Sequence, residues 1–452
     1  MNSYSAQLWV RTTCRSDDFP PIATDKAWSG GDIVDYTSHH NFGKSRDTGS
    51  LRGWCIALQP SGAWAWNVGD GEHRLDYLPT ARRQPINDGE WHHLAFSIDP
   101  EDRVAWLYYD GGNVAVYSLA ELGDLLSGAP VLSGAQADGT VSFAGEVEIE
   151  LKVEQRRLTP SEVESAWRHR SGEAMASAAA EDSVTEIRVL SWNIWHGGRR
   201  DGDVEGLART IEIIRRSEAD VICMQETYGS GAHIADGLGY YFYLRSSNLS
   251  VMSRFPIRKA YDLFEPFRFG GVCLTLSPGQ EMLLFSLWIH YLPDFCHDVL
   301  EEGMTAQKLV AAEDETRGRE IDQILAVLKP ILERRAGDLP VVVGGDFNSP
   351  SHLDWTEAML HRNRGLIVRW PVSEAMAKAG FTDSYRAVHT DPSQHVGRTW
   401  SPRSSASWQD RIDYIYYQGD GLSCSSAEVL EHFEPQWPSD HAAVLATLTI
   451  HR

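Results

Sequence analysis

The sequence predicts an all-β sandwich in its N-terminal half and an α/β domain in its C-terminal half. The chain has 452 residues, which at roughly 100–200 residues per domain corresponds to two domains. The first half has short runs of aromatic and β-branched residues between turn residues, whereas the second alternates long apolar strands with amphipathic helices. We therefore expect domains at 1–170 and 186–452. The linker at 171–185 is small, polar and without aromatic anchors up to Asp182, and an Ala-rich helix is its alternative.

Regular short strands and turn signals predict the N-terminal sandwich. Alternating or β-prone runs begin at Gln7, Trp54 and Trp64, and such runs are typical of half-buried strands. Turns rich in Gly, Pro and Asn separate these runs, as at residues 110–112. One helix is expected near the end of this half, because residues 159–162 read Thr-Pro-Ser-Glu, which is a capping box with Pro at the first helical position.

Three motifs stand out in this half: Asn87-Asp-Gly-Glu-Trp-His-His-Leu-Ala-Phe, Leu107-Tyr-Tyr-Asp-Gly-Gly and Leu158-Thr-Pro-Ser-Glu-Val. With these motifs, residues 4–170 resemble a laminin-G-like, concanavalin-type jelly roll. The resemblance implies a sandwich of two antiparallel sheets and suggests a carbohydrate or an envelope component as ligand. Such domains usually begin with a strand before the one that we predict at Gln7, so we expect a trimmed N-terminus or a degenerate edge strand.

Polar residues recur where the apolar strands of the C-terminal half end. Helices are predicted from Val204 to Ser217 and from Glu320 to Leu332, with strands before, between and after them. In α/β folds, sites lie at the C-terminal ends of strands. A single carboxylate there is usually a helix cap or a turn former, but this does not explain a whole ordered set. The set comprises Asn193, Glu226, His290, Asp346, Asn348, Asp413, Asp440 and His441.

This ordered set resembles the endonuclease/exonuclease/phosphatase family over residues 186–452. The motifs are Met-Gln-Glu-Thr around Glu226, Gly-Gly-Asp-Phe-Asn around Asp346 and Pro-Ser-Asp-His ending at His441. The resemblance implies a four-layered α/β sandwich like that of deoxyribonuclease I. It also implies a hydrolase that cleaves phosphate esters with Mg²⁺, or with Mn²⁺ or Ca²⁺, and without an organic cofactor. It does not fix the substrate.

Phosphoester hydrolysis suggests a role for each residue type. Mg²⁺ prefers oxygen ligands, so we expect Glu226, Asn193 and Asp440 to form the metal site. Asp346 is expected to orient or deprotonate the attacking water. Asn348, two residues further on, projects to the same side and can donate to the phosphoryl group.

Two histidines and one further carboxylate complete the expected catalytic set. His290 and His441 would donate hydrogen bonds or positive charge to the phosphoryl oxygens. Asp413 would orient one of these histidines and raise its basicity.

Three further residues are candidates for substrate binding. His196 follows the first strand beside two glycines, and a solvated loop histidine is its alternative. Arg319, together with Arg317, opens the helix at Glu320 and can reach a phosphate, with a solvated helix face as the alternative. His352 comes soon after the catalytic loop and either binds substrate or caps the next helix.

The jelly-roll half carries no comparable set. His92 and His93 are neighbours in a strand, so they point to opposite faces and do not easily chelate one ion. Trp64 and Trp66 share one face, and packing in the core is favoured over stacking on a sugar. Weaker candidates are a Ca²⁺ site at Asp25, Asp32 and Asp35, and a disulfide between Cys14 and Cys55.

The formal net charge of −22, from 41 basic and 63 acidic residues, argues against a nonspecific nucleic-acid coat protein. No apolar run approaches the ~20 residues of a membrane helix, and no signal peptide is evident. The jelly roll nevertheless favours an extracytoplasmic location.

We therefore expect a metal-dependent phosphodiesterase that acts on a compact phosphodiester. The first alternative is a DNA or RNA nuclease, and in that case we expect nucleic acid to be a substrate and not a lasting partner. The others are a lipid or inositol-phosphate phosphatase and a carbohydrate-binding protein with an inactive hydrolase domain.

Overall fold

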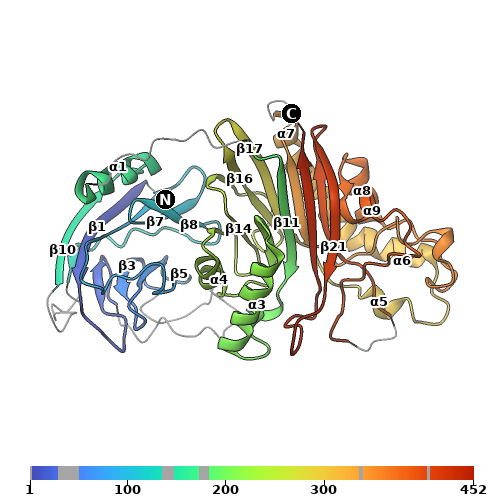
Figure 1. The fold of residues 1–452 in the computed structure, drawn as a ribbon, viewed down its shortest axis with the longest axis horizontal. Helices are drawn as coiled ribbons and strands as arrows, with labels where there is room; N and C mark the ends of the chain where they lie inside the picture. Colours follow the sequence, from blue (N-terminus) through green and yellow to red (C-terminus); the bar gives the residue numbers. More distant parts are fainter. Residues whose placement is uncertain are drawn as a thin grey trace. The chain divides into compact units, whose positions relative to one another are not determined.

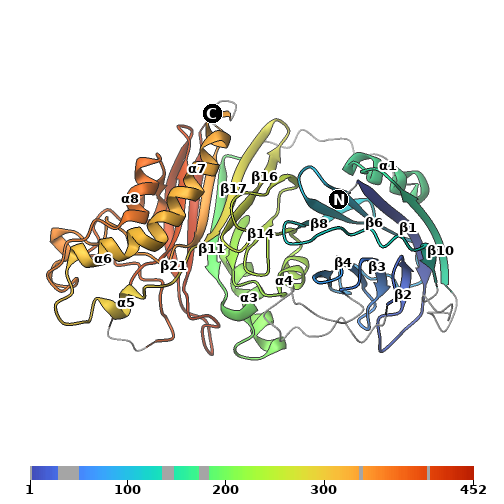
Figure 2. The same ribbon diagram turned by 180° about the vertical axis from the view of Figure 1, so that it is seen from behind.

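The computed structural model describes residues 3–28, 50–134, 147–172, 183–334, 339–404 and 408–451. The chain forms two compact units (Figures 1 and 2). The first unit comprises Met1–Ala179 and Tyr228–Ser247, and the second comprises Ala180–Thr227 and Asn248–Arg452. Residues 173–182 of the predicted linker lie outside the described residues.

The first unit is built from two sheets. One has the strand order β10-β1-β6-β7-β8-β13 and the other the order β5-β4-β3-β2-β9. Neighbours are antiparallel except for β8 and β13, which run parallel. The strands are β1 (Tyr4–Thr12), β2 (Pro21–Thr24), β3 (Gly53–Leu58), β4 (Trp64–Gly69), β5 (Arg74–Tyr77), β6 (His92–Asp99), β7 (Val104–Tyr109), β8 (Gly112–Ser118), β9 (Leu132–Ser133), β10 (Val147–Glu154) and β13 (Tyr241–Leu244).

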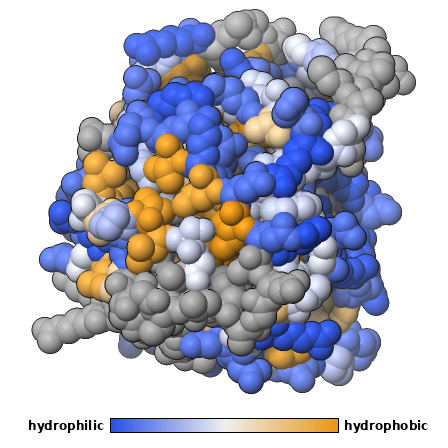
Figure 3. Space-filling view, turned by 90° about the vertical axis from the view of Figure 1, so that its left-hand side faces the viewer, coloured by the Kyte–Doolittle hydropathy of each residue, from blue (hydrophilic) through white to orange (hydrophobic). Residues whose placement is uncertain are grey.

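Aromatic side chains fill the space between these sheets. Trp66 of β4 lies with its ring centroid 5.9 Å from that of Phe96 in β6 and 5.8 Å from that of Tyr117 in β8. Trp64 and Trp66 are 0% exposed, so neither contributes to the group of apolar residues visible on the mainly hydrophilic face in Figure 3. Both tryptophans pack in the core, which confirms the interpretation favoured from the sequence.

The segment after Glu226 belongs to the first unit. It contains α4 (Gly231–Leu238) and β13, and β13 pairs with β8 through Phe242 and Ala115. The carboxylate of Asp236 in α4 accepts hydrogen bonds from the backbone N of Thr80 (2.9 Å) and from Nε2 of Gln84 (2.7 Å). A strand distant in sequence thus extends the sheet formed by the N-terminal residues.

Helix α1 (Pro160–Ser171) begins at the predicted capping box. Thr159 Oγ1 accepts a hydrogen bond from the backbone N of Glu162, and the Glu162 carboxylate accepts one from the backbone N of Thr159. Two donors that a helix start would leave without partners are satisfied in this way. Figure 1 shows α1 beside β1 and β10.

The polar residues singled out in the jelly-roll sequence have structural partners. His92 Nδ1 lies 2.9 Å from Asp110 Oδ2 and its Nε2 lies 3.1 Å from Asp88 Oδ1, whereas His93 Nε2 meets Gln7 instead. The two histidines therefore point to different partners and do not share an ion.

The other weak candidates in this half fare in the same way. Asp25 is buried and accepts from the backbone N of Trp54, while Asp32 and Asp35 lie outside the described residues. Cys14 and Cys55 are both buried and form no disulfide, so the disulfide considered between them is absent.

The second unit also has two sheets. One has the order β14-β12-β11-β22-β21, and the other is six-stranded with the order β15-β16-β17-β18-β20-β19. Their strands are β11 (Glu186–Asn193), β12 (Val221–Gln225), β14 (Ser250–Ser253), β15 (Ile257–Tyr261), β16 (Phe269–Ser277), β17 (Gln280–Trp288), β18 (Val341–Asp346), β19 (Thr382–Asp383), β20 (Asp413–Gln418), β21 (Leu422–Leu430) and β22 (Ala443–Ile450).

Helices cover the outer faces of both sheets, which gives the predicted four layers (Figures 1 and 2). Ile321, Ile324 and Leu328 of α7 pack on one sheet beside Phe285 of β17, and α3 lies beside the other sheet (Figure 1). The helical segments are α2 (Trp195–Gly198), α3 (Asp203–Ser217), α5 (Phe295–Asp298), α6 (Ala306–Glu313), the π-helical turn η2 (Asp314–Gly318), α7 (Arg319–Arg334), η3 (Glu357–Met359), α8 (Pro371–Lys378) and α9 (Ser384–Val388). Among the described residues, no helix combines the length and apolar character needed to cross a lipid bilayer.

Candidate active site

Two consecutive glycines let neighbouring backbones approach at the end of β18. A Cβ atom on Gly344 would lie 2.9 Å from the Cβ of Cys223 in the facing sheet, and one on Gly345 would lie 2.2 Å from the carbonyl oxygen of Leu287. Larger residues are therefore excluded at both positions. The strand then ends on Asp346, which it presents at the edge where β11 also ends.

Asn193, the last residue of β11, joins two carboxylates. Its Nδ2 donates to Asp346 Oδ2 at 3.1 Å and lies 3.2 Å from Glu226 Oε1. Its Oδ1 accepts from the backbone N of Trp195 at 3.0 Å. The side chain is fully buried, so its amide holds the ends of two sheets in one fixed polar cluster.

Glu226 follows β12 directly and adopts a left-handed backbone conformation with φ of 54°. Its backbone N donates to Asn248 Oδ1 at 2.9 Å, and its Oε2 accepts from the backbone N of His196 at 2.9 Å. The side chain is half-buried. The backbone turn and these two hydrogen bonds aim the carboxylate toward Asn193.

Asp346, His441 and Asp413 form the second part of the cluster. His441 Nδ1 lies 2.9 Å from Asp413 Oδ2, and its Nε2 lies 3.8 Å from Asp346 Oδ2. Asp346 and Asp413 are register partners on the antiparallel strands β18 and β20, so their side chains leave the same face of the sheet. All three residues are buried.

This burial changes the protonation of the cluster. Loss of solvent raises the pKa of Asp346 to about 7, against the attraction of His441. Burial opposes protonation of His441, but the carboxylates of Asp413 and Asp346 raise its pKa well above the usual value. The arrangement therefore favours an imidazolium beside a carboxyl group that titrates near neutral pH.

Asn348 and His290 occupy the loops after β18 and β17. The backbone N of Asn348 donates to Asp346 Oδ1 at 3.0 Å, and its Nδ2 donates to the carbonyl of Ile289 at 2.9 Å. The backbone N of His290 donates to Glu320 Oε2 at 2.8 Å, and its Nδ1 accepts from the backbone N of Leu292. Asn348 thus connects the two loops directly.

Asp440 has an oxygen that is free to bind a cation. Its Oδ1 is buried without a hydrogen-bond partner among the described residues. Burial raises the pKa of Asp440, and the negative charge of Glu226 adds to the effect even though His441 opposes it. A bound divalent cation would offset the repulsion between the carboxylates of Asp440 and Glu226 and would supply a partner for the buried oxygen of Asp440. Together with Glu226, Asp440 therefore fits a hard metal ion.

Asp346, Asp413 and His441 form a second possible metal site, because one ligand atom from each lies within 4.8 Å of the others. The hydrogen bond between His441 and Asp413 occupies Nδ1, and a protonated imidazole does not bind a metal. This group is therefore better suited to proton and charge handling, and the Glu226 side of the cluster is better suited to a cation.

The three candidate substrate-binding residues take different places. His196 approaches Glu226 through its backbone N. Arg319 is exposed at the start of α7. His352 bonds Ser373 of α8 through both its backbone N and its Nδ1, each at 2.8 Å. Among the contacts of the described residues, only His196 joins the cluster around Asn193.

The continuous helical segment α6-η2-α7 braces the catalytic loops. Glu313 is 0% exposed, and its Oε1 accepts from Ser349 Oγ at 2.8 Å, next to Asn348. Burial raises the pKa of Glu313 to about 7. Arg317 is also buried and donates to the carbonyls of His290 (3.3 Å) and Pro293 (2.9 Å). Arg317 therefore holds a loop, a role that the sequence did not suggest.

Sequence reasoning missed Asn248, which positions Glu226 through the hydrogen bond described above. A lone Asn in a loop normally caps or turns the chain, so no pattern in a single sequence separates it from ordinary loop residues. The segment Thr399-Trp400 resembles the family in sequence, and the structure shows what Thr399 does: its Oγ1 accepts from the backbone N atoms of Ile412 and Asp413.

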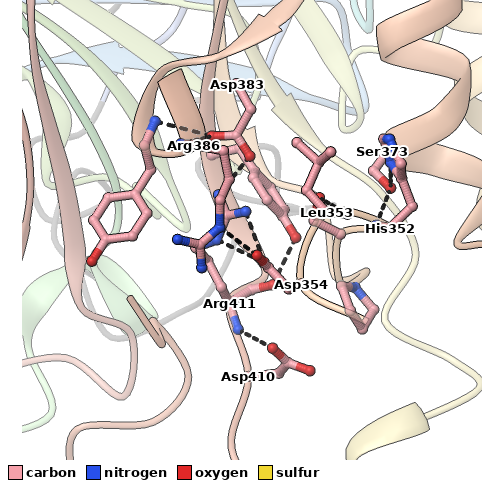
Figure 4. Close-up of polar contacts among 12 residues, drawn as sticks. His352, Leu353, Asp354, Ser373, Asp383, Arg386, Asp410 and Arg411 are labelled. Carbon is pink, nitrogen blue, oxygen red and sulfur yellow. Dashed lines mark hydrogen bonds and ion pairs between the residues drawn. The ribbon is translucent and has the colours of Figure 1, made fainter. Parts of the chain in front are cut away.

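A buried charge network supports the strand that carries Asp413 (Figure 4). Arg411 Nη2 lies 2.7 Å from Asp354 Oδ2, and its Nη1 lies 2.7 Å from Asp383 Oδ2. Arg386 Nε binds the other oxygen of Asp354 at 2.5 Å. Asp354 comes from the loop after Asn348, so the network fixes the loop and the Asp413 strand relative to each other.

Comparisons with known proteins agree with this architecture. The Endonuclease/Exonuclease/phosphatase family profile matches residues 190–441, and the Concanavalin A-like lectin/glucanases superfamily profile matches residues 1–164. The uncharacterised Caenorhabditis elegans protein F14F9.5 is 27% identical over 293 residues, which cover 58% of this chain and 91% of that protein.

Similar solved structures share little sequence with the chain. Truncated TDP2 of Caenorhabditis elegans is 17% identical, covers 58% of this chain and 98% of its own, and has a TM-score of 0.40. The human Nocturnin catalytic domain with bound sulfate is also 17% identical, covers 60% of this chain and 97% of its own, and has a TM-score of 0.41.

The two profile matches confirm the predicted jelly roll and the deoxyribonuclease I-like fold. The match to the Endonuclease/Exonuclease/phosphatase profile spans more than half of the chain and runs from the first strand of the predicted set to His441. The chain therefore belongs to the endonuclease/exonuclease/phosphatase family and is a hydrolase of phosphate esters.

Proposed function

We propose that the protein is a divalent-metal-dependent phosphodiesterase that hydrolyses a compact phosphodiester by in-line attack of water. The observation that supports this most directly is the amide of Asn193, which hydrogen-bonds both Asp346 and Glu226. It brings the candidate base and the candidate metal ligand to one point, as phosphoryl transfer requires. Enzymes of this family generally depend on a divalent metal.

The residues on the Asp346 side handle the proton and the developing charge. A carboxyl group with a pKa of about 7 suits a general base at neutral pH, because base strength and the fraction of deprotonated groups are then balanced. Asp346 takes the proton of the attacking water. The imidazolium of His441, oriented by Asp413, donates to a phosphoryl oxygen and stabilises its negative charge.

The residues on the Glu226 side bind the cation and the substrate. Glu226 and Asp440, with the Asn193 amide oxygen, would hold Mg²⁺, Mn²⁺ or Ca²⁺. When bound, the ion neutralises charge on the phosphate. Asn348 and His290 lie in two loops that a hydrogen bond from Asn348 to the carbonyl of Ile289 connects, and both would orient the phosphoryl group. Given these residues, the reaction requires no organic cofactor.

Charge favours a compact substrate over a long polyanion. The chain has a formal net charge of −22, and broad binding to DNA or RNA needs a basic surface. A nuclease therefore remains the alternative activity of the same site, followed by a lipid or inositol-phosphate phosphatase. For the jelly roll, a carbohydrate or envelope ligand is the corresponding proposal.

Hydrolysis of bis-p-nitrophenyl phosphate with Mg²⁺ tests the proposal. We expect the wild type to release p-nitrophenolate and Glu226→Ala to lose at least about 10²-fold in rate. Glu212→Ala is the matched control, because Glu212 is a partly exposed acid on α3 paired with Arg215 and Arg216. Equal rates for the wild type and Glu226→Ala on every phosphate ester would refute the proposal. Plasmid cleavage that falls steeply with salt would favour the nuclease.

A further inference from the structure

An aromatic surface borders the candidate site. Tyr291, directly after His290, is 54% exposed. Its ring lies parallel to that of His290, with centroids 5.2 Å apart and an interplanar angle of 3°. The centroid of the Trp288 ring lies 6.4 Å from that of Tyr291, and the two rings are tilted by 49°. Phe267 meets Trp288 edge to face at 5.5 Å. We call Phe267, Trp288 and Tyr291 the aromatic surface.

Strand register places this surface beside the candidate base. Trp288 on β17 is the register partner of Asp346 on the parallel strand β18. Register partners in neighbouring strands project from the same face of a sheet. Trp288 therefore lies one strand spacing, about 4.8 Å, from the backbone that presents Asp346.

A second connection runs to the candidate metal ligand. The carbonyl of Phe267 accepts a hydrogen bond from Asn248 Nδ2 at 2.9 Å. Oδ1 of the same Asn248 side chain accepts a hydrogen bond from the backbone N of Glu226. Asn248 thus links Phe267 of the aromatic surface to Glu226, which places the surface at the edge of the candidate active site.

Glu320 fixes the segments that carry the aromatic surface. Its Oε2 accepts from the backbone N of His290, and its Oε1 lies 3.3 Å from Nη1 of Arg268. The backbone N of Trp288 donates to the carbonyl of Arg268. The surface is therefore held in place before a ligand binds, which reduces the entropy lost on binding.

We propose that the aromatic surface stacks a nucleobase attached to the scissile phosphate, so that the compact phosphodiester is a nucleotide ester. This inference rests on the proposed function. Aromatic rings bind the flat face of any base. A polyphosphorylated headgroup would instead need several free cations, and the guanidinium of Arg268, which lies 5.4 Å from the Trp288 ring, is paired with Glu320.

The test compares two esters with the same leaving group. One is the p-nitrophenyl ester of thymidine 5′-monophosphate and the other is methyl p-nitrophenyl phosphate. We expect the wild type to prefer the nucleoside ester, mainly through KM. Tyr291→Leu keeps apolar volume but removes the flat ring, so it should raise KM for the nucleoside ester by about 5- to 100-fold and leave the methyl ester unchanged.

Two further variants separate stacking from general damage to the surface. Tyr291→Phe keeps the ring and should recover most of the preference for the nucleoside ester. Ile367→Ala removes another exposed apolar side chain and should leave both KM values unchanged.

The outcomes distinguish the two proposals. If Tyr291→Leu alters neither ester, or alters both equally, the aromatic surface does not bind a base while the phosphodiesterase function stands. If the wild type hydrolyses neither ester, the proposed function fails. Calorimetric binding of thymidine 5′-monophosphate to the wild type and to Tyr291→Leu then decides the inference, because equal affinities or no binding would overturn it.

Discussion

Buried carboxylates are treated differently in the two units of the chain. In the jelly-roll unit, Asp25 accepts from the backbone N of Trp54 and from Ser127 Oγ, one hydrogen bond for each oxygen. In the second unit, Asp413 and Asp440 each keep a buried oxygen without a hydrogen-bond partner among the described residues. Such an oxygen destabilises the fold unless a ligand binds it. Glu313 of the same unit also has a buried oxygen without such a partner, so these carboxylates lie in the second unit, both at the candidate site and in the helical segment that braces it.

Histidines show the same difference. Both ring nitrogens of His92 in the jelly roll lie within hydrogen-bond distance of carboxylates. His441 uses Nδ1 for Asp413, but its Nε2 lies 3.8 Å from Asp346, beyond an ordinary hydrogen bond. One nitrogen of His441 thus remains free to face a substrate. The variants below test whether the jelly-roll groups serve stability and the groups of the second unit serve turnover.

The largest effect is expected for Asp346→Asn. An amide cannot take a proton from water, so kcat should fall by at least about 10³-fold. The variant should fold normally, since a neutral side chain of the same shape replaces a buried carboxyl group. Steady-state kinetics with calorimetric titration of Mg²⁺ check this. A lost affinity for the metal would instead make Asp346 a ligand.

His441→Ala and His92→Ala form the next pair. Loss of the imidazolium at His441 should lower kcat by about 10²- to 10³-fold. His92→Ala should lower Tm and leave kcat unchanged, because the His92 ring makes polar contacts with Asp88, Asp110 and Tyr109, all within the jelly-roll unit. Kinetics and thermal unfolding of both variants provide the measurement. A slow His92 variant with unchanged Tm would contradict the division between units.

Local sequence was sufficient to predict several of the strand ends at which the candidate site residues lie. Periodicity gave the strands that end on Asn193 and Asp346, and the alternation in a strand separated His92 from His93. These features depend on neighbours in the sequence, so a pattern reveals them. Trp64 and Trp66 were assigned to the core for the same reason, and the structure confirms it.

Features that depend on distant contacts could not be predicted. Nothing in Asp236 or its neighbours shows that this carboxylate binds Thr80 and Gln84 of the jelly roll. Arg317 appears as a surface residue of a helix, but the π-helical turn η2 changes the helical phase and buries it. Such turns often occur at functional sites, and a single sequence gives little indication of them.

Glu313→Gln should change how stability depends on pH. The folded protein keeps the proton of Glu313 up to about pH 7, whereas the unfolded chain releases it near 4.5. The folded state therefore binds more protons in this range, and its stability falls as pH rises from about 4.5 to 7. Gln abolishes this contribution, so the variant should gain stability relative to wild type by on the order of 3 kcal/mol across the range.

Urea unfolding of wild type and Glu313→Gln at several pH values measures the difference. Below about pH 4.5 the relative stability of the two proteins should not vary with pH, because the carboxyl group is then neutral in both states. A difference that is constant from pH 4 to 8 would show that Glu313 is ionised in the folded protein. Glu212→Gln, which changes a partly exposed acid of the same unit, is the control.

The smallest effect concerns Arg170 in the jelly-roll unit. Its guanidinium lies 4.1 Å from the ring centroid of Trp91 and 4.9 Å from that of Trp9. A cation over aromatic rings at a partly exposed site contributes about 0.5–1 kcal/mol, so Arg170→Ala should lower the free energy of unfolding by about this amount. Arg258→Ala removes an exposed arginine of the second unit that pairs with Glu281, and it should change stability less. Both variants should keep the wild-type kcat/KM. If Arg170→Ala slows turnover at unchanged stability, the jelly roll takes part in the reaction and the division between a stabilising unit and a working unit fails.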